Sequence, residues 1–205
     1  MNLFEDTYFT ISKPSEGIFR DRGSKFLGFA FPVKTEEEVK AHVQHLKKEH
    51  FSARHHCTAF RMGPDKQFFR VNDDGEPSGT AGRPILGQIQ SRDLTNILIV
   101  VVRYFGGTLL GVGGLINAYK QAATDALEHA EIVEKTVNEQ YRIQFGYDSM
   151  NDVMKIIKDN DLIQSKQDFG LQCVLEISVR KGEAERIITL FGKVDDVRTE
   201  YLKTD

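Results

Sequence analysis

The pattern of apolar and polar positions divides the chain into two stretches of different character. In the first, residues 96–105 contain an apolar run that does not alternate, which predicts a strand buried on both faces. A helix is predicted over 115–133, whose many alanines would let it approach a sheet closely. Another is predicted over 36–50, where Thr35 and Glu38 form a capping box. Further strands are expected at 8–19, 25–33, 57–62 and 67–71.

The second stretch predicts six elements in the order β-α-β-β-α-β, which is the split βαβ pattern of ferredoxin-like domains. Their ranges are 137–145, 150–159, 162–169, 171–180, 183–191 and 194–201. We therefore expect an α+β chain of two domains. Residues 1–135 would form a first domain of mixed strands and helices, and residues 136–205 a ferredoxin-like domain.

Charge follows the same division. Residues 1–135 carry 17 basic and 17 acidic side chains, and residues 136–205 carry 10 and 13, which gives the net charge of −3. This balance does not favour a broad basic surface for duplex nucleic acid. The longest apolar run, 97–102, is far shorter than the roughly 20 residues of a membrane span. With no signal peptide visible, we expect a cytoplasmic protein that has no membrane partner.

The segment 73–84 is the first candidate site. It packs three carboxylates, two hydroxyls and an arginine into eleven positions, 73–83. Such a set can orient a polar ligand, hold a hard cation or perform acid–base chemistry. The alternative is a solvated turn, since Asp-Gly and Gly-Glu-Pro are typical turn sequences. The candidate ligand-binding residues are Asp74, Glu76, Ser78, Thr80 and Arg83.

A glycine-rich loop over 106–114, between the buried strand and the long helix, is the second candidate. A helix N-terminus offers free N–H groups to an anion, and glycine lets a ligand approach the backbone. The spacing matches neither a Walker loop nor the dinucleotide fingerprint. Tight packing of strand on helix is the alternative interpretation. The candidate residues are Arg103, Tyr104, Gly106, Gly107, Gly113, Gly114 and Lys120.

Two shorter segments add cations and a thiol. Arg22 and Lys25 lie in a basic turn that could contact phosphate. Arg54 and His55 precede Cys57, and strand geometry would place His55 and Cys57 on one face. Two ligands are too few for zinc, so we expect no metal, and we interpret Cys57 as a core residue rather than a nucleophile. No cofactor and no catalytic residue is assigned.

Four segments in this order resemble the YigZ/IMPACT family over about residues 20–120. They are Arg22-Gly23-Ser24-Lys25-Phe26-Leu27-Gly28, Ala53-Arg54-His55-His56-Cys57, Asp74-Gly75-Glu76-Pro77-Ser78-Gly79-Thr80-Ala81-Gly82, and Val102-Arg103-Tyr104-Phe105-Gly106-Gly107 through Gly113-Gly114-Leu115. The second domain resembles the C-terminal domain of the bacterial members by pattern and position. The order and spacing of the four motifs make the resemblance specific.

The resemblance implies that residues 1–135 form a two-layer α/β domain, similar to the second domain of a small-subunit ribosomal protein and to the GHMP kinases. It implies a second domain similar to the last domain of elongation factor G. The kinase signature is absent from the glycine-rich loop, so kinase activity is not inferred. Eukaryotic IMPACT proteins are linked to regulation of translation.

Three functions follow as hypotheses. The first is regulation of translation through RNA, the ribosome or a translation-associated protein. The alternative is an enzyme or small-molecule binder for a phosphorylated or otherwise anionic ligand at the glycine-rich loop. The third is a protein–protein interface anchored by Phe105, Leu109 and Leu110. An oligomer is compatible with all three.

Overall fold

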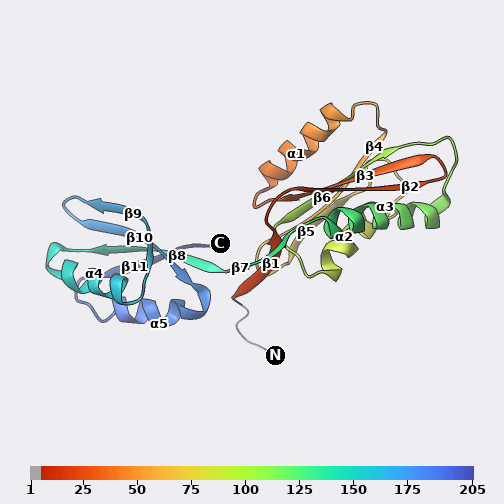
Figure 1. Ribbon diagram of the computed structural model, residues 1–205. Helices are drawn as coiled ribbons and strands as arrows, with labels where there is room; N and C mark the ends of the chain where they lie inside the picture. Colours follow the sequence, from red (N-terminus) through yellow and green to blue (C-terminus); the bar gives the residue numbers. More distant parts are fainter. Residues whose placement is uncertain (1–5) are drawn as a thin grey trace. The chain divides into compact units, whose positions relative to one another are not determined.

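The computed structural model describes residues 6–205 (Figure 1), so residues 1–5 of the predicted first domain lie outside the described residues. The chain divides into two compact units. One is Phe9–Lys135, and the other joins residues 6–8 to Thr136–Asp205. The strands β1 (Thr7–Ile11) and β7 (Ile132–Thr136) pair with each other in a two-stranded sheet.

A five-stranded antiparallel sheet organises the first unit. The spatial order is β2-β3-β6-β4-β5, so β6 (Ile97–Tyr104) lies at the centre. Residues 97–102 of β6 are all fully buried, as the unbroken apolar run predicts. The other strands are β2 (Ser15–Asp21), β3 (Ser24–Pro32), β4 (His55–Met62) and β5 (Phe68–Asn72).

Helices cover both faces of this sheet. Helix α1 (Glu36–Glu49) lies on one face, and α2 (Gly82–Ser91) and α3 (Gly111–Glu128) lie on the other (Figure 1). Alternate residues of β6 point to the two faces. Ile99 packs in the core with α2 and α3, and Val100 in the core with α1. The predicted α/β class is confirmed, and α1 adds a third layer to the two that the sequence predicted.

The alanines of α3 let it lie very close to the sheet, as expected. A Cβ on Gly17 would lie 2.2 Å from the backbone nitrogen of Ala126, and one on Gly28 would lie 2.4 Å from the carbonyl oxygen of Ala122. Both distances are too short for any side chain. Glycines in β2 and β3 are therefore the partners of the helix alanines.

Helix boundaries differ from the sequence prediction at three places. α3 begins at Gly111 rather than at residue 115, and it ends at Glu128. Residues 132 and 133, predicted as the end of that helix, belong instead to β7. α2 was not predicted, because its N-terminus is capped by a distant side chain: the Asp73 carboxylate accepts from the backbone N–H groups of Ala81 (3.1 Å) and Gly82 (2.8 Å).

The second unit has the predicted β-α-β-β-α-β order. A four-stranded sheet of order β11-β8-β10-β9 packs on two helices, with Phe145, Leu175 and Phe191 in the core. A short 3₁₀ helix, η1 (Tyr147–Ser149), precedes the first helix. The other elements are β8 (Asn138–Phe145), α4 (Met150–Asp159), β9 (Ile163–Phe169), β10 (Cys173–Arg180), α5 (Lys181–Phe191) and β11 (Arg198–Thr204). Within residues 6–205, no helix is both long and apolar enough to cross a membrane.

Candidate functional site

A pocket of about 390 Å³ lies in the first unit where the end of β6, the start of β4 and the N-terminus of α3 meet. Polar side chains from three of the four family motifs come together here. The charged and polar residues are Arg54, His55, Glu76 and Arg103. Apolar residues and the first residue of α3 complete the wall, namely Pro77, Phe105, Leu109, Leu110, Gly111, Val112 and Leu115. His55 and Arg103 face each other across the β4–β6 pair.

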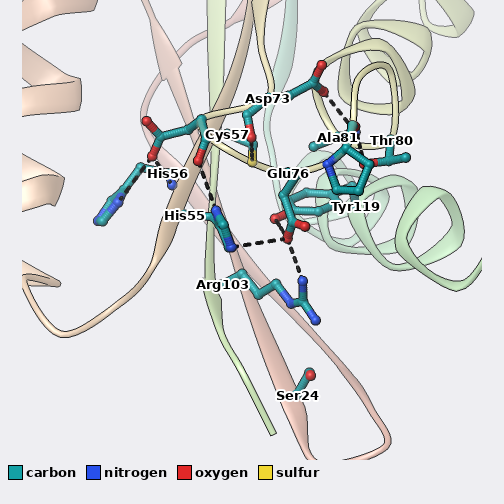
Figure 2. A network of polar contacts seen from close by, with 12 residues as sticks. Ser24, His55, His56, Cys57, Asp73, Glu76, Thr80, Ala81, Arg103 and Tyr119 are labelled. Carbon is teal, nitrogen blue, oxygen red and sulfur yellow. Dashed lines mark hydrogen bonds and ion pairs between the residues drawn. The ribbon is translucent and has the colours of Figure 1, made fainter. Parts of the chain in front are cut away.

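Glu76 is the centre of the polar network that Figure 2 shows. Its side chain is 4% exposed, and its Oε1 accepts from Arg103 Nη1 (2.6 Å) and from the hydroxyl of Tyr119 (2.8 Å). Burial raises the pKa of Tyr119 well above its usual range, so that hydroxyl stays protonated and donates. The opposite charge and the two hydrogen bonds offset the cost of burying the carboxylate.

Arg103 is the buried cation of the pocket, with a side chain only 6% exposed. Its guanidinium lies between two aromatic rings, 5.4 Å from the ring centre of Phe26 and 5.6 Å from that of Phe105. Among the described residues, the one hydrogen bond of the Arg103 side chain is from Nη1 to Glu76, and Nε is buried without a partner. A buried donor without a partner is costly and calls for an explanation.

His55 presents one defined ring nitrogen to the site. Its Nδ1 lies 2.9 Å from the carbonyl oxygen of Asp74, and a carbonyl only accepts, so Nδ1 carries the proton. In the neutral ring Nε2 is then an acceptor. It lies 3.9 Å from Oε1 of Glu76, where it can accept a hydrogen bond from a ligand.

Asp73 fixes the segment that carries Glu76. Its carboxylate accepts from the N–H of Gly79 (2.8 Å) in addition to those of Ala81 and Gly82. Burial alone would raise the pKa of Asp73, but these three backbone donors outweigh it and hold the pKa below its usual range. The segment 73–82 is therefore an ordered loop held by a charged cap rather than a freely solvated turn.

Cys57 takes no part in the pocket chemistry. It is fully buried, and its thiol donates to the carbonyl oxygen of Asp73 at 3.0 Å. Burial raises the pKa of Cys57 far above its usual range, so the thiol stays protonated and is no nucleophile. In residues 6–205, no three His, Cys, Asp or Glu side chains are gathered in a way that would hold a metal ion.

Three of the predicted residues lie on the opposite face of the sheet, toward α1. The Asp74 carboxylate accepts from the N–H of His56 (2.7 Å) and contacts Lys47 Nζ (3.1 Å). The Lys25 ammonium lies 5.8 Å from the ring centre of Tyr104. These two residues are paired across β3 and β6, next to the Phe26–Arg103 pair, and successive strand residues point to opposite faces. Asp74, Lys25 and Tyr104 therefore do not line the pocket.

The remaining polar candidates also lie outside the pocket. Thr80 is buried and its hydroxyl donates to the carbonyl oxygen of Pro77 at 2.6 Å, which holds the loop. The other four are exposed, namely Arg22, Ser78, Arg83 and Lys120. Their positions suit contacts with a large partner better than contacts with a ligand in the pocket.

Of the predicted glycines, Gly106 has a packing role. A Cβ on Gly106 would lie 1.9 Å from the carbonyl carbon of Gly23, and its N–H donates to the Ser24 hydroxyl at 3.1 Å. Gly107 has a φ of +85°, which favours glycine. Gly113 and Gly114 lie in the first turn of α3, whose N-cap has no side-chain hydrogen bond. The pocket wall thus includes the open N-terminus of α3, at Gly111 and Val112.

Sequence reasoning missed Tyr119, which holds Glu76 from the buried face of α3. The sequence does place Tyr119 among alanines on the apolar face of the predicted helix. A buried tyrosine hydroxyl needs a hydrogen-bond partner, so this position could have pointed to the site. It also named Leu110 as an exposed anchor, whereas Leu110 is buried. Phe105 and Leu109 are exposed, 45% and 82%, and both line the pocket.

The family model of the Impact N-terminal domain matches residues 22–127, which include every residue of the pocket. The chain belongs to the IMPACT family. IMPACT family member YvyE of Bacillus subtilis is 32% identical over 86% of this chain and 82% of its own length. IMPACT family member YigZ of Escherichia coli is 38% identical over 67% of this chain and 69% of its own.

A solved structure supports the architecture over the full chain. The crystal structure of a hypothetical protein superposes with a TM-score of 0.76 at 28% identity, covering 98% of this chain and 99% of that one. The fold of the chain is therefore shared with a solved protein, and the family resemblance of the four motifs is confirmed.

Proposed function

We propose that this IMPACT-family chain binds a small anion in the pocket at the N-terminus of α3. The observation that carries the proposal is Arg103, a nine-tenths buried cation on the pocket wall whose Nε has no hydrogen-bond partner. An anion would give this donor a partner. The open helix N-terminus at Gly111 and Val112 adds a second source of favourable charge.

The magnitudes are adequate for a weak metabolite site. A helix terminus contributes about 0.3–1 kcal/mol, and a hydrogen bond from a charged donor contributes about 1.5–3 kcal/mol. Together they approach the roughly 4 kcal/mol of a millimolar dissociation constant. Contacts with the apolar walls would add to this value, so we expect affinities between micromolar and millimolar.

Membership of the IMPACT family links the chain to the regulation of translation. We infer that occupancy of the pocket is the signal this domain contributes. Direct binding to RNA or the ribosome is the second candidate, favoured by the exposure of Arg22, Arg54 and Arg83. Arg103 does not serve that role, because it is buried against Glu76.

Titration calorimetry on the whole chain tests the first candidate, with small carboxylates, inorganic phosphate and nucleotides as probes. Arg103→Met should abolish binding of any anion that the wild type binds. Arg20→Met is the matched control, since Arg20 is exposed on β2 and does not line the pocket. Binding that survives Arg103→Met would refute the proposal. Following the bound probe by NMR shows whether it is consumed.

The second candidate is tested with short single-stranded RNAs at two salt concentrations. A phosphate-dominated contact weakens as salt rises, and its salt dependence falls when cations are removed. Arg22→Ala combined with Arg83→Ala should therefore weaken RNA binding at low salt. Unchanged RNA affinity in that double variant would count against RNA contact through these residues.

A further inference from the structure

We propose that the ligand of this pocket is a small monocarboxylate with a short apolar body. This rests on the proposed function and names the chemical class of its ligand. Four features of the pocket lead to it: net charge, the free edge of one guanidinium, the absence of phosphate-binding side chains, and exposed apolar walls.

The charges that line the pocket favour a single negative charge on the ligand. Two guanidinium groups, Arg54 and Arg103, and one carboxylate, Glu76, leave one net positive charge. A phosphate monoester carries about −1.5 to −2 at neutral pH, which would exceed it. The lining also holds no lysine, serine or threonine, the side chains that commonly assist phosphate binding.

The free edge of Arg103 has the geometry of a carboxylate site. Nη1 is occupied by Glu76, which leaves Nε and Nη2 on the other edge without hydrogen bonds among the described residues. Two parallel donors on one planar edge match two oxygens of an anion, a carboxylate or a phosphate, and the charge balance of the lining favours the carboxylate. Nε is buried, so an oxygen reaches it only when a neighbouring side chain turns aside. We assign that movement to Phe105, whose ring centre lies 5.6 Å from the guanidinium and which lines the pocket and is 45% exposed.

The apolar part of the lining suits an apolar body. Leu109 and Val112 line the pocket yet are 82% and 60% exposed, so the site leaves apolar surface in water that a ligand would cover. A volume of about 390 Å³ lies at the small end of ligand pockets. A branched chain of four to six carbons is therefore a reasonable probe.

The experiment is calorimetric titration of the whole chain with isocaproate, isocaproamide, acetate and inorganic phosphate. Isocaproate should bind most tightly. The amide lacks the charge and acetate lacks the apolar body, so each should bind at least about 10-fold more weakly. Arg103→Met should remove isocaproate binding, and Arg20→Met should leave it unchanged.

A second variant covers the case in which Arg103→Met does not fold. Leu109→Ala changes an exposed side chain and should weaken isocaproate about 3-fold or more while leaving acetate unaffected. Arg103-dependent binding of phosphate without binding of carboxylates would overturn the carboxylate assignment and leave the proposed anion site standing. Absence of Arg103-dependent binding of any anion would overturn both. Isocaproate binding indifferent to Leu109→Ala would overturn the assignment of the apolar wall.

Discussion

Replacing Glu76 by glutamine tests whether the buried charge pair holds the pocket together. Glu76→Gln keeps the size of the side chain and one carbonyl oxygen, but it removes the negative charge that lies 2.6 Å from Arg103 Nη1. The guanidinium would then be buried without a counter-charge. The Tyr119 hydroxyl, 2.8 Å from the same oxygen, would keep an acceptor of lower strength.

The expected cost follows from the burial of both partners. Removing one partner of a fully buried ion pair costs about 3–5 kcal/mol. Here the glutamine oxygen still accepts hydrogen bonds, and the pair borders a pocket, so we expect about 2 kcal/mol. Arg103→Met should cost a similar amount, because it leaves the Glu76 carboxylate buried. The losses of unfolding free energy in the two single variants, added together, should then exceed the loss in the double variant by about 3 kcal/mol. This value is at the upper end of couplings between contacting residues.

Hydrogen exchange of the β4 and β6 amides is the suitable assay, because the chain has two units and a single unfolding transition cannot be assumed. A fall of about 2 kcal/mol in the unfolding free energy corresponds to a roughly 30-fold drop in the protection factor of amides that exchange through global unfolding. Glu16→Gln is the control, since Glu16 is exposed on β2. If Glu76→Gln costs no more than Glu16→Gln, or if the effects of Glu76→Gln and Arg103→Met add, the charge pair does not hold the pocket together.

Three further outcomes are expected. Gly106→Ala should destabilise the first unit by more than about 2 kcal/mol, because its Cβ would lie 1.9 Å from the carbonyl carbon of Gly23. A Cβ at Gly113 would meet nothing within 4 Å, so Gly113→Ala should be neutral or stabilise by up to about 1 kcal/mol; hydrogen exchange of the β6 amides measures both changes. The folded-state pKa of Asp73 is lowered, so the stability that its carboxylate contributes is present above its ordinary pKa of 3.8 and is lost as pH falls through the folded-state value. Asp73→Asn should therefore flatten the fall of the unfolding free energy between about pH 5 and pH 2. An unchanged slope would contradict this. If His55 Nε2 is an acceptor, a hydroxyl on the ligand can donate to it, so 2-hydroxyisocaproate should bind about 3- to 10-fold more tightly than isocaproate. His55→Phe should abolish this preference. Calorimetric titration measures both affinities.

Elements with strong local periodicity were predictable, and those held by distant groups were not. The unbroken run in β6 and the alternation in β10 report burial directly. α2 is short, contains Pro84 and Gly87, and receives its cap from Asp73, nine residues before Gly82, so no local signal marks its start.

The candidate residues were predicted from composition, and they are more numerous than those that line the pocket. Glu76 and Arg103 were both named although they lie 27 positions apart, because motif chemistry does not depend on distance along the chain. Arg103 and Tyr104 were named together, yet neighbours on a strand point to opposite faces, and that rule alone would have removed one of them. Tyr119 became visible only when α3 was packed against the loop that carries Glu76.

The charge pair at the base of the pocket is difficult to explain by stability alone. Apolar residues of similar volume often stabilise a fold as well as a buried ion pair or better. The double variant Glu76→Gln with Arg103→Met should therefore fold within about 1 kcal/mol of the wild type, as judged by hydrogen exchange of β6.

The same double variant should bind no isocaproate, because it lacks the guanidinium that would hold the carboxylate. A folded protein that no longer binds would separate the two roles of the pair and assign its charge to ligand recognition. A double variant that unfolds would show instead that Glu76 and Arg103 serve the fold. One that folds and binds isocaproate like the wild type would show that the pair is needed for neither role and would refute the assignment of its charge to the ligand.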